Sequence, residues 1–581
     1  MQLLKNMNFL DAFHHQADLI HNLGEGNAYL VWIMAIYLDA PDSFGLASES
    51  LTDSADDKKI DFIRFDRDAK RIVFSQGYYS LKKKDKAPAN KASDLNTAAA
   101  WLFSGDLDGV PRNLKSIIAE CRKAIANDDV DQIDLLYVHN LPESVNVARE
   151  LITAAQHIDK ILPVARKISV IHRELGLENA DRLYASKGSP LLVRDEIECP
   201  SAPILNEKGD EWRSAIMSVP GAWLREQFHK HGEDLFSANY RGFLGISKRK
   251  KINSGIRSTA ENSPSNFWAF NNGITILTNK FSPKNGGTLL SGMSIINGAQ
   301  TTGSLGSIDS SQHPLSNLRV LCRLIECSDP TIIGDIVKYN NTQNEITTWD
   351  QYSNSPEQRR IQQEFSELGH DYSLKRGYEA SNSRLGIEVV AQPLIALEGG
   401  YVDANRGKNV IFERQALYKK AFESKKARHI LFAFTLARAI DEFRLVLKQK
   451  YIDGSIIDIE SNQLLLFRNL RFRNFFISII GRCLEQILGQ GVDVGLVAFI
   501  PEFSNARNKT FDELVAIWLP IVGMVLVHIV AVSNQDISEI MGKSNGLDDI
   551  ALKVGALIYA SQLTGIPNSI EIFRKTVSAK G

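Results

Sequence analysis

An apolar run that stops at an asparagine-glycine pair constrains this chain more than any other feature of its sequence. Residues 293–296 predict a buried strand, and Asn297 and Gly298 both tolerate the positive φ that a tight turn requires. Small hydrogen-bonding residues follow, beginning with Gln300 and Thr301. A strand, a glycine turn and small polar residues in this order often bring backbone N–H groups close to a ligand.

Two further amide clusters flank this turn. They are Asn271, Asn272 and Gly273 upstream, and Asn341, Gln343 and Asn344 downstream. Three amide-rich turns in one segment indicate a site that recognises its ligand through neutral hydrogen bonds. The alternative interpretation is a set of ordinary turns that touch no ligand. The segment lacks the repeated glycines and the following lysine of a phosphate-binding loop, so the nature of the ligand stays open.

The composition is that of an ordinary globular protein. The length of 581 residues corresponds to three or four domains or one large multi-lobed body. With 44% hydrophobic and 23% charged residues, the chain has enough apolar side chains to form sizeable cores. A net charge of −1 means that any contact with nucleic acid must come from local basic patches. Five cysteines fit a reducing cytosol, and Cys322 with Cys327 alone does not make a zinc site.

One segment approaches the length of a membrane span. Residues 514–532 contain no Asp, Glu, Lys or Arg, but they include Pro520, Gly523 and His528. We expect two buried helical pieces of a soluble core here, and a membrane span is the alternative. The N-terminus lacks the charged and apolar regions of a signal peptide, so a cytoplasmic location with no membrane contact is expected.

The order of predicted elements indicates a mixed α/β fold. Residues 1–167 alternate helices with strands at 60–65, 71–79 and 133–138, which is typical of an α/β domain. Residues 168–204 form a junction, and a central α+β domain over 205–424 holds all three amide clusters. Residues 425–581 show helical spacing, with helices predicted at 429–451, 461–488, 511–532 and 547–563.

The N-terminal hairpin carries a candidate catalytic constellation. Asp61 lies on its first strand, and alternation places Gln76 and Tyr78 on one face of the second. With Glu25 as the candidate upstream carboxylate, this layout resembles the PD-(D/E)XK nucleases, in which carboxylates hold Mg²⁺ and a lysine stabilises phosphate charge. Here Tyr78 stands at the lysine position, and Lys82 is the candidate replacement. The alternative is that Asp61 is simply a solvent-facing carboxylate beside a lysine.

A second resemblance covers residues 235–422 and rests on an ordered set of motifs. The motifs are Leu235-Phe236 with Asn239 and Arg241, residues 253–256, residues 267–275, residues 297–302, residues 341–346, and Lys375-Arg376-Gly377. In this order they are similar to the abortive-infection phage-resistance (AIPR) family. The resemblance implies a bacterial antiviral role, with a defence-operon protein as a candidate partner, and it implies no settled reaction. The turn at Asn297 is also similar to one in DNA-modification regulators, which favours a nucleotide or nucleic-acid phosphate as ligand.

Basic residues add candidate phosphate contacts. Residues 248–251 form a lysine- and arginine-rich loop, and residues 468–476 place three arginines among phenylalanines. For the second patch the alternative is a solvated arginine face above core phenylalanines. His370 is expected to be structural.

Two main hypotheses follow from these features. In the first, the chain is a defence effector that cleaves nucleic acid with Asp61, Gln76, Lys82 and Glu25, and needs Mg²⁺ for this reaction. In the second, it is a non-catalytic sensor of a nucleotide, nucleic acid or phage protein, with a degenerate nuclease core. A homo-oligomer is compatible with both. A third reading is an unrelated soluble enzyme that uses Asn297 and Gln300 on a small metabolite.

Overall fold

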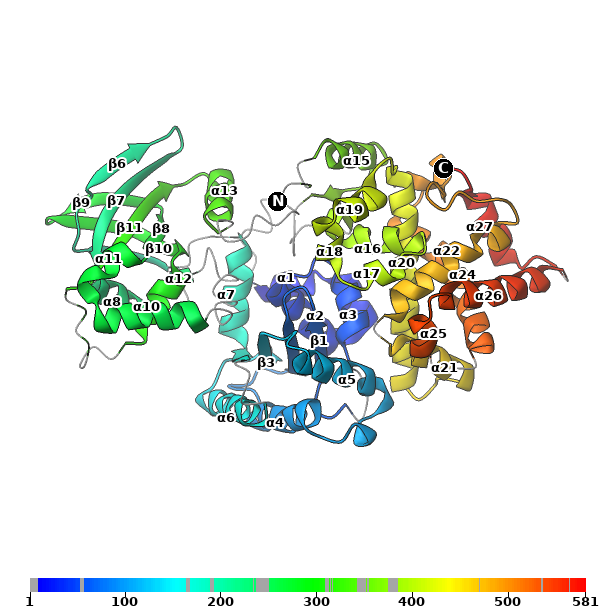
Figure 1. Cartoon of the computed structure of the whole chain (residues 1–581), viewed down its shortest axis with the longest axis horizontal. Coiled ribbons are helices and arrows are strands. Elements are labelled where there is room, and N and C mark those ends of the chain that lie inside the picture. The colour runs from blue at the N-terminus through cyan, green and yellow to red at the C-terminus, as the bar shows by residue number, and fades with distance from the viewer. Residues whose placement is uncertain are drawn as a thin grey trace. The chain divides into compact units, whose positions relative to one another are not determined.

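The computed structural model divides into two compact units, described separately below (Figure 1). The first unit comprises Met1–His15 with Leu177–Ile346, and the second comprises Gln16–Gly176 with Thr347–Gly581. The structure describes residues 9–52, 57–162, 168–188, 193–232, 235–236, 250–308, 313, 315, 317–341, 352, 355–374, 385–469, 471–533, 537–563 and 565–581.

The first unit is built on a mixed seven-stranded sheet. Its strands run in the order β5-β10-β8-β11-β7-β6, and β9 pairs with β10. The apolar run before Asn297 is the end of the central strand β10, as its sequence predicts. The bounds are α1 (Phe9–His14), α7 (Leu177–Gly188), β5 (Val193–Cys199), β6 (Leu205–Lys208), β7 (Trp212–Pro220), α8 (Gly221–His231), α10 (Lys250–Asn262), α11 (Phe267–Phe270), β8 (Ile274–Thr278), β9 (Lys280–Lys284), β10 (Gly287–Asn297), α12 (Ala299–Gly306), β11 (Arg319–Cys327) and α13 (Pro330–Asn341).

The second unit opens with a four-stranded sheet in the order β1-β2-β3-β4. The first two strands form the antiparallel hairpin expected from the sequence, and β3 and β4 continue the sheet in parallel. Parallel pairing requires crossovers, and helices α4, α5 and α6 supply them. The bounds are α2 (Ala17–Leu38), α3 (Ser43–Ser50), β1 (Phe62–Asp66), β2 (Arg71–Tyr78), α4 (Ala89–Phe103), α5 (Arg112–Ala126), β3 (Gln132–His139), α6 (Val145–Ile161) and β4 (Ser169–Leu175).

Helices make up most of the remainder of the second unit. They pack around the long helix α20, which is buried along much of its length. The bounds are α15 (Pro356–Glu367), β12 (Tyr372–Ser373), β13 (Leu385–Gly386), α16 (Ile387–Leu397), α17 (Tyr401–Ala404), α18 (Lys408–Glu413), α19 (Gln415–Phe422), α20 (Ala427–Ile452), α21 (Asp458–Phe467), α22 (Phe472–Leu488), β14 (Ala498–Phe499), α23 (Pro501–Ser504), α24 (Phe511–Val532), α25 (Ile537–Gly542), α26 (Gly546–Gln562), α27 (Asn568–Thr576) and β15 (Val577–Ser578). The mixed α/β fold class with a helical C-terminal region is therefore confirmed.

Two predicted helix boundaries in this region are wrong. The helix expected over 461–488 is two helices, α21 and α22, because Phe467 and Phe472 both turn into the core and the chain breaks between them. The two pieces expected within 514–532 are the single helix α24, which continues through Pro520.

Helix α24 is long and apolar enough to cross a membrane by length and composition, and among the described residues the bent pair α2 and α3 passes the same test only if counted as one broken span. Eight residues of α24 are buried, and they recur at the three-to-four spacing of one helix face. This face packs against α20 and α26 in the hydrophobic core. One face of α24 is therefore buried in the core of the second unit.

The N-terminal sheet and the C-terminal helices of the second unit meet at α3. Arg438 of α20 forms an ion pair with Asp42, the N-cap of α3, over 3.1 Å. At the other end of α3, the Lys448 ammonium donates to the carbonyl oxygens of Ser48 and Leu51, over 3.0 and 2.7 Å. Cations near a helix C-terminus stabilise its unpaired carbonyls.

Candidate active site at the edge of the N-terminal sheet

Asp61 is held at the start of the β1–β2 hairpin by main-chain hydrogen bonds. Its own N–H donates to the carbonyl oxygen of Ser75 over 2.9 Å. Its carboxylate oxygen Oδ2 accepts from the N–H of Gly77 over 2.7 Å. The carboxylate therefore has a fixed position beside strand β2, as a catalytic or metal-binding group requires.

The surroundings of Asp61 disfavour its ionisation. Burial raises the pKa of Asp61 to about 7, although the hydrogen bond from Gly77 acts in the opposite direction. The charge of Asp57 and a hydrogen bond with its side chain also raise this pKa, whereas the charge of Lys91 lowers it. Two adjacent carboxyl groups that share a proton form an oxygen-rich site where a bound cation would relieve their repulsion.

Gln76 and Tyr78 lie on strand β2, as predicted. Gln76 is 1% exposed, and its Oε1 accepts no hydrogen bond from the described part of the chain. The hydroxyl of Tyr78, at the lysine position of the resembled motif, accepts a hydrogen bond from the Lys84 ammonium over 2.7 Å. This hydrogen bond lowers the pKa of Tyr78. Lys84 thus brings a positive charge to the position where the motif itself lacks one.

Further acidic groups converge on Tyr137 of β3. The strand register pairs Tyr137 with Gln76 on one side and with Glu174 of β4 on the other. Burial raises the pKa of Tyr137, and the charges of Glu174, Asp61 and Asp94 add to this effect. The carboxyl ends of these strands therefore carry more acidic groups than the two carboxylates predicted from the sequence. Glu174 already has partners, since it accepts hydrogen bonds from His139 and from the Ser144 N–H, each over 3.1 Å.

Lys91 and Asp94 were not predicted from the sequence. Both lie on α4, three residues apart, and residues at this spacing share a helix face. The signal available in the sequence was a Lys-x-x-Asp pair on the helix after the second strand. The predicted Lys82 lies exposed in the loop after β2, and its carbonyl oxygen accepts from the Ser80 hydroxyl. Glu25 is exposed on α2, and its charge acts on Tyr79.

The oxygen donors at this edge fit a hard divalent cation in one respect. Mg²⁺ in proteins is commonly held by one or two carboxylates together with water and substrate phosphates, and Asp57 with Asp61 supplies two carboxylates. Among the described residues, no group of three or more His, Cys, Asp or Glu side chains is arranged to hold a metal. All five cysteines are free and buried.

The amide turns of the first unit pack tightly against each other. Gly273 and Gly298 have φ values of 79° and 91°, and a Cβ on Gly298 would lie 2.8 Å from the carbonyl oxygen of Gly273. The side-chain amide of Asn271 donates to the Phe267 carbonyl over 3.1 Å, which closes its own turn. Thr301 is buried on α12, Gln300 is half-buried, and Asn272 is exposed.

Asn297 has a structural partner on α13. Its amide donates to the carbonyl oxygen of Asn340 over 3.1 Å, and the side-chain oxygen of Asn340 accepts from Arg323 of β11. These contacts tie the end of α13 to the central strands. Asn341 ends α13, and the structure describes its backbone only. Six predicted ligand residues lie outside the described residues: Asn239, Arg241, Gln343, Asn344, Lys375 and Arg376.

The phenylalanines and one arginine of the second predicted basic patch are internal, while Arg471 is exposed. Phe472, Phe475 and Phe476 are fully buried, which confirms the core alternative for them. Arg473 forms two hydrogen bonds with the buried carboxylate of Asp441, over 2.8 and 2.6 Å, and does not form a solvent-facing patch. In the loop at 248–251, the structure describes only the backbone of the last two residues. His370 binds the carbonyl oxygen of Ser504 over 3.1 Å, in keeping with a structural role.

Comparison with protein families shows which proteins the central motifs are similar to. Residues 236–426 match the family model described as AIPR protein. This segment is similar to AIPR proteins. The match confirms the resemblance seen in the sequence and extends from the first compact unit into the second. No curated protein and no solved structure matches the chain, so the nuclease-like interpretation of the N-terminal sheet rests on its own geometry.

Proposed function

We propose that this protein acts in abortive-infection defence against phage and that its N-terminal sheet cleaves nucleic acid in a divalent-cation-dependent reaction. The similarity to AIPR proteins supports the defence role. The observation that carries the proposed reaction is the carboxyl pair of Asp61 and Asp57, whose repulsion and burial raise the pKa of Asp61 to about 7. Such perturbed carboxyl groups cluster at functional sites.

The proposed roles follow from the surroundings of each group. Asp57 and Asp61 would hold Mg²⁺, which supplies Lewis-acid polarisation of a phosphoryl group when bound. Asp61 is positioned for this by the Gly77 N–H. Lys91, whose charge acts on Asp61, takes the role that Lys82 holds in the sequence-based hypothesis, because a phosphodiester transition state needs nearby positive charge.

The test uses the full chain with plasmid, single-stranded DNA and RNA, each with Mg²⁺ and with chelator. We expect Mg²⁺-dependent cleavage of at least one substrate, its loss in Asp61→Asn, and a decrease of about 100-fold or more in Lys91→Ala. Lys115→Ala is the matched control, because Lys115 lies on α5 in a surface ion pair with Asp108. Equal rates in wild type, Asp61→Asn and Lys91→Ala on every substrate would contradict the proposal.

The alternative is a non-catalytic sensor of a nucleotide, nucleic acid or phage protein. Tyr78 at the lysine position favours it, because a neutral phenol cannot replace a fixed ammonium. A nucleotide at one hundred times its dissociation constant would then stabilise the protein by about 2.7 kcal/mol, which a melting curve detects. In either case we propose a cytoplasmic protein, with a defence-operon protein or a second copy of the chain as further candidate partners.

A further inference from the structure

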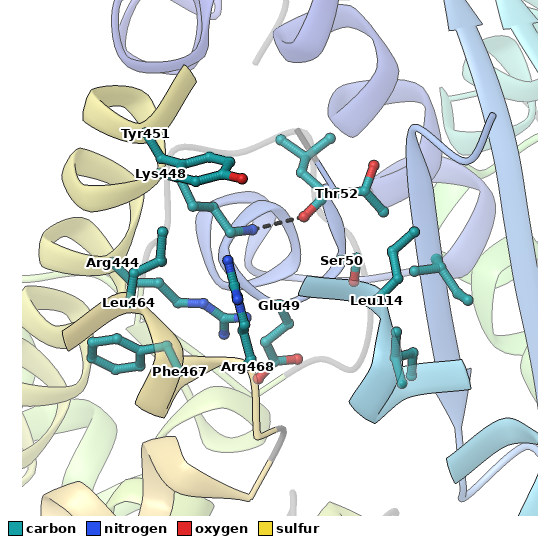
Figure 2. A pocket seen from close by; sticks show the side chains of 13 residues that line it. Glu49, Ser50, Thr52, Leu114, Arg444, Lys448, Tyr451, Leu464, Phe467 and Arg468 are labelled. Carbon is teal, nitrogen blue, oxygen red and sulfur yellow. Dashed lines mark hydrogen bonds between the residues drawn. The ribbon is translucent and has the colours of Figure 1, made fainter. Parts of the chain in front are cut away.

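A cavity of about 60 Å³ lies in the second unit between the end of α3 and helices α20 and α21 (Figure 2). It has room for a few water molecules or for one small oxyanion. Its polar lining consists of Glu49, Ser50, Thr52, Arg444, Lys448 and Arg468. Neither Asp57 nor Asp61 lines this cavity.

The charges around the cavity favour an anion. Arg444, Lys448 and Arg468 contribute three positive charges, and Glu49 contributes the only negative charge of the lining. Burial opposes ionisation of Glu49, but the charges of Arg64, Arg473 and Arg444 outweigh it and lower its pKa. Arg64 forms an ion pair with the Glu49 carboxylate over 3.0 Å. Arg64 and Arg473, which do not line the cavity, thus offset part of the Glu49 charge, and the lining keeps more positive than negative groups.

Two buried donors at the cavity have no hydrogen-bond partner among the residues that the structure describes. Arg444 is 8% exposed, and its Nε makes no hydrogen bond within the described part of the chain. Ser50 is 1% exposed, and its hydroxyl is likewise unpaired there. Buried polar groups without a partner cost free energy, so they are rare in folded proteins and call for water or a ligand.

The cavity wall is held in place before any ligand binds. The Lys448 ammonium donates to the carbonyl oxygens of Ser48 and Leu51, and Figure 2 shows it reaching from α20 toward the segment that carries Thr52. The Thr52 hydroxyl donates to the carbonyl oxygen of Ile60. These bonds occupy Lys448 and Thr52. The Arg444 Nε and the Ser50 hydroxyl remain as lining donors without a hydrogen-bond partner in the described part of the chain, and Arg468 adds a positive charge to the same lining.

We propose that this cavity binds a phosphate-sized oxyanion through Arg444, Arg468 and the Ser50 hydroxyl. The ligand is inorganic phosphate or the terminal phosphate monoester of a nucleotide or nucleic acid, which presents the same oxygens. Guanidinium groups suit such oxygens because their planar donors bind two of them at once. The volume excludes a whole nucleotide, so a base or sugar would remain at the mouth, near Tyr451.

The test is calorimetric titration of the full chain with inorganic phosphate at constant ionic strength, with chloride as the reference anion. Parallel titrations use one short oligonucleotide with and without a 5′ phosphate, to distinguish the two sources. We expect saturable phosphate binding, weakened about tenfold or more by Arg444→Gln and by Arg468→Gln, and more modestly by Ser50→Ala. Arg507→Gln, at an exposed position of the same unit, is the control and should bind as wild type does.

Ser50→Ala keeps the test decisive if an arginine variant fails to fold. Its hydroxyl has no partner in the described structure, so its removal should leave the melting temperature unchanged or raised while phosphate binding weakens. The proposal is overturned if the wild type shows no saturable phosphate binding, or if Ser50→Ala and the folded arginine variants bind as tightly as Arg507→Gln. Because the readout is binding, these outcomes are independent of whether the chain cleaves nucleic acid.

Discussion

The main-chain N–H of Thr52 donates a 3.1 Å hydrogen bond to the carbonyl oxygen of Asp61. Thr52 lines the cationic cavity, and Asp61 carries the carboxyl group of the candidate active site. The adjacent residues Leu51 and Phe62 form an isolated β-bridge. Residues 51–52 are therefore paired with residues 61–62, so a segment that lines the cavity is bonded to the segment that carries Asp61. A ligand that stiffens the cavity wall also restrains the main chain of Asp61.

Lys448→Met should loosen these paired segments. The change removes two charge-assisted hydrogen bonds to the end of α3 and is expected to cost about 1–3 kcal/mol. Hydrogen exchange should become faster across residues 48–52 and 60–62. Lys450→Met is the control, since it removes a lysine of the same helix whose partly solvent-exposed ion pair is with Glu460 and not with the end of α3. Unchanged exchange in Lys448→Met would show that the pairing of these segments does not depend on the Lys448 ammonium.

Asp61→Asn should stabilise the protein at alkaline pH in the presence of chelator. Burial raises the folded-state pKa of Asp61 to about 7, above the ordinary value near 4. The folded state therefore holds a proton that the unfolded state has lost, and stability falls as pH rises from about 4 to about 7. Asparagine removes this loss, so the melting temperature of Asp61→Asn should exceed that of wild type at pH 8 and not at pH 4. A wild-type advantage at pH 8 would contradict the cause assigned to the shift.

Arg473→Ala should be among the most destabilising substitutions in the second unit. It leaves the buried Asp441 carboxylate without the two hydrogen bonds that compensate its burial, at an expected cost of about 3–5 kcal/mol. The double variant Arg473→Met with Asp441→Leu removes both charges and should recover most of this loss. Calorimetric melting measures both effects, and additive losses in the double variant would show that the two residues act independently.

The sequence was sufficient for the hairpin and for the first catalytic candidates, because these depend on local patterns. Alternating apolar residues and the turn between them define β1 and β2, and the same alternation places Gln76 and Tyr78. The strand before Asn297 and the turn glycine Gly298 were found for the same reason. The residues that pair in the hairpin are close in the sequence, since Phe62 pairs with Ser75 and Asp66 with Arg71.

The remaining site residues could not be predicted, because sheet order and helix packing bring them together. Glu174 reaches Tyr137 only because β4 adds to the sheet beside β3. Glu49 and Arg444 are almost 400 residues apart in the chain, and they meet only because α3 packs on α20. The arginines at 468–473 looked like a surface patch, since no local pattern shows that Asp441 takes one of them into the core.

Gly273→Ala should destabilise the first unit. Gly273 has a φ of 79°, and an added Cβ would overlap the carbonyl oxygen of Leu321 on β11. Strain and overlap together should cost about 2–4 kcal/mol. Gly255→Ala on α10 is the control, because nothing lies within 4 Å of its added Cβ, and alanine favours a helix there. Thermal melting of both variants tests the prediction, and an equal melting temperature would show that the turn can shift to admit a side chain.

Acid should destabilise the second unit through His429. This side chain is 1% exposed, its Nδ1–H donates to the Val497 carbonyl over 2.7 Å, and its Nε2 is buried without a partner in the described structure. Burial lowers the pKa of His429 to about 4. The unfolded state therefore takes up a proton near pH 6.5 while the folded state does not, so stability is lost as pH falls from about 6.5 to about 4.

The loss of stability through His429 should approach about 3 kcal/mol. It should disappear in His429→Gln, which keeps a donor for Val497 and cannot titrate. His21→Gln, at an exposed position on α2, should retain the wild-type dependence, and a parallel pH profile for His429→Gln would assign the acid sensitivity to other groups.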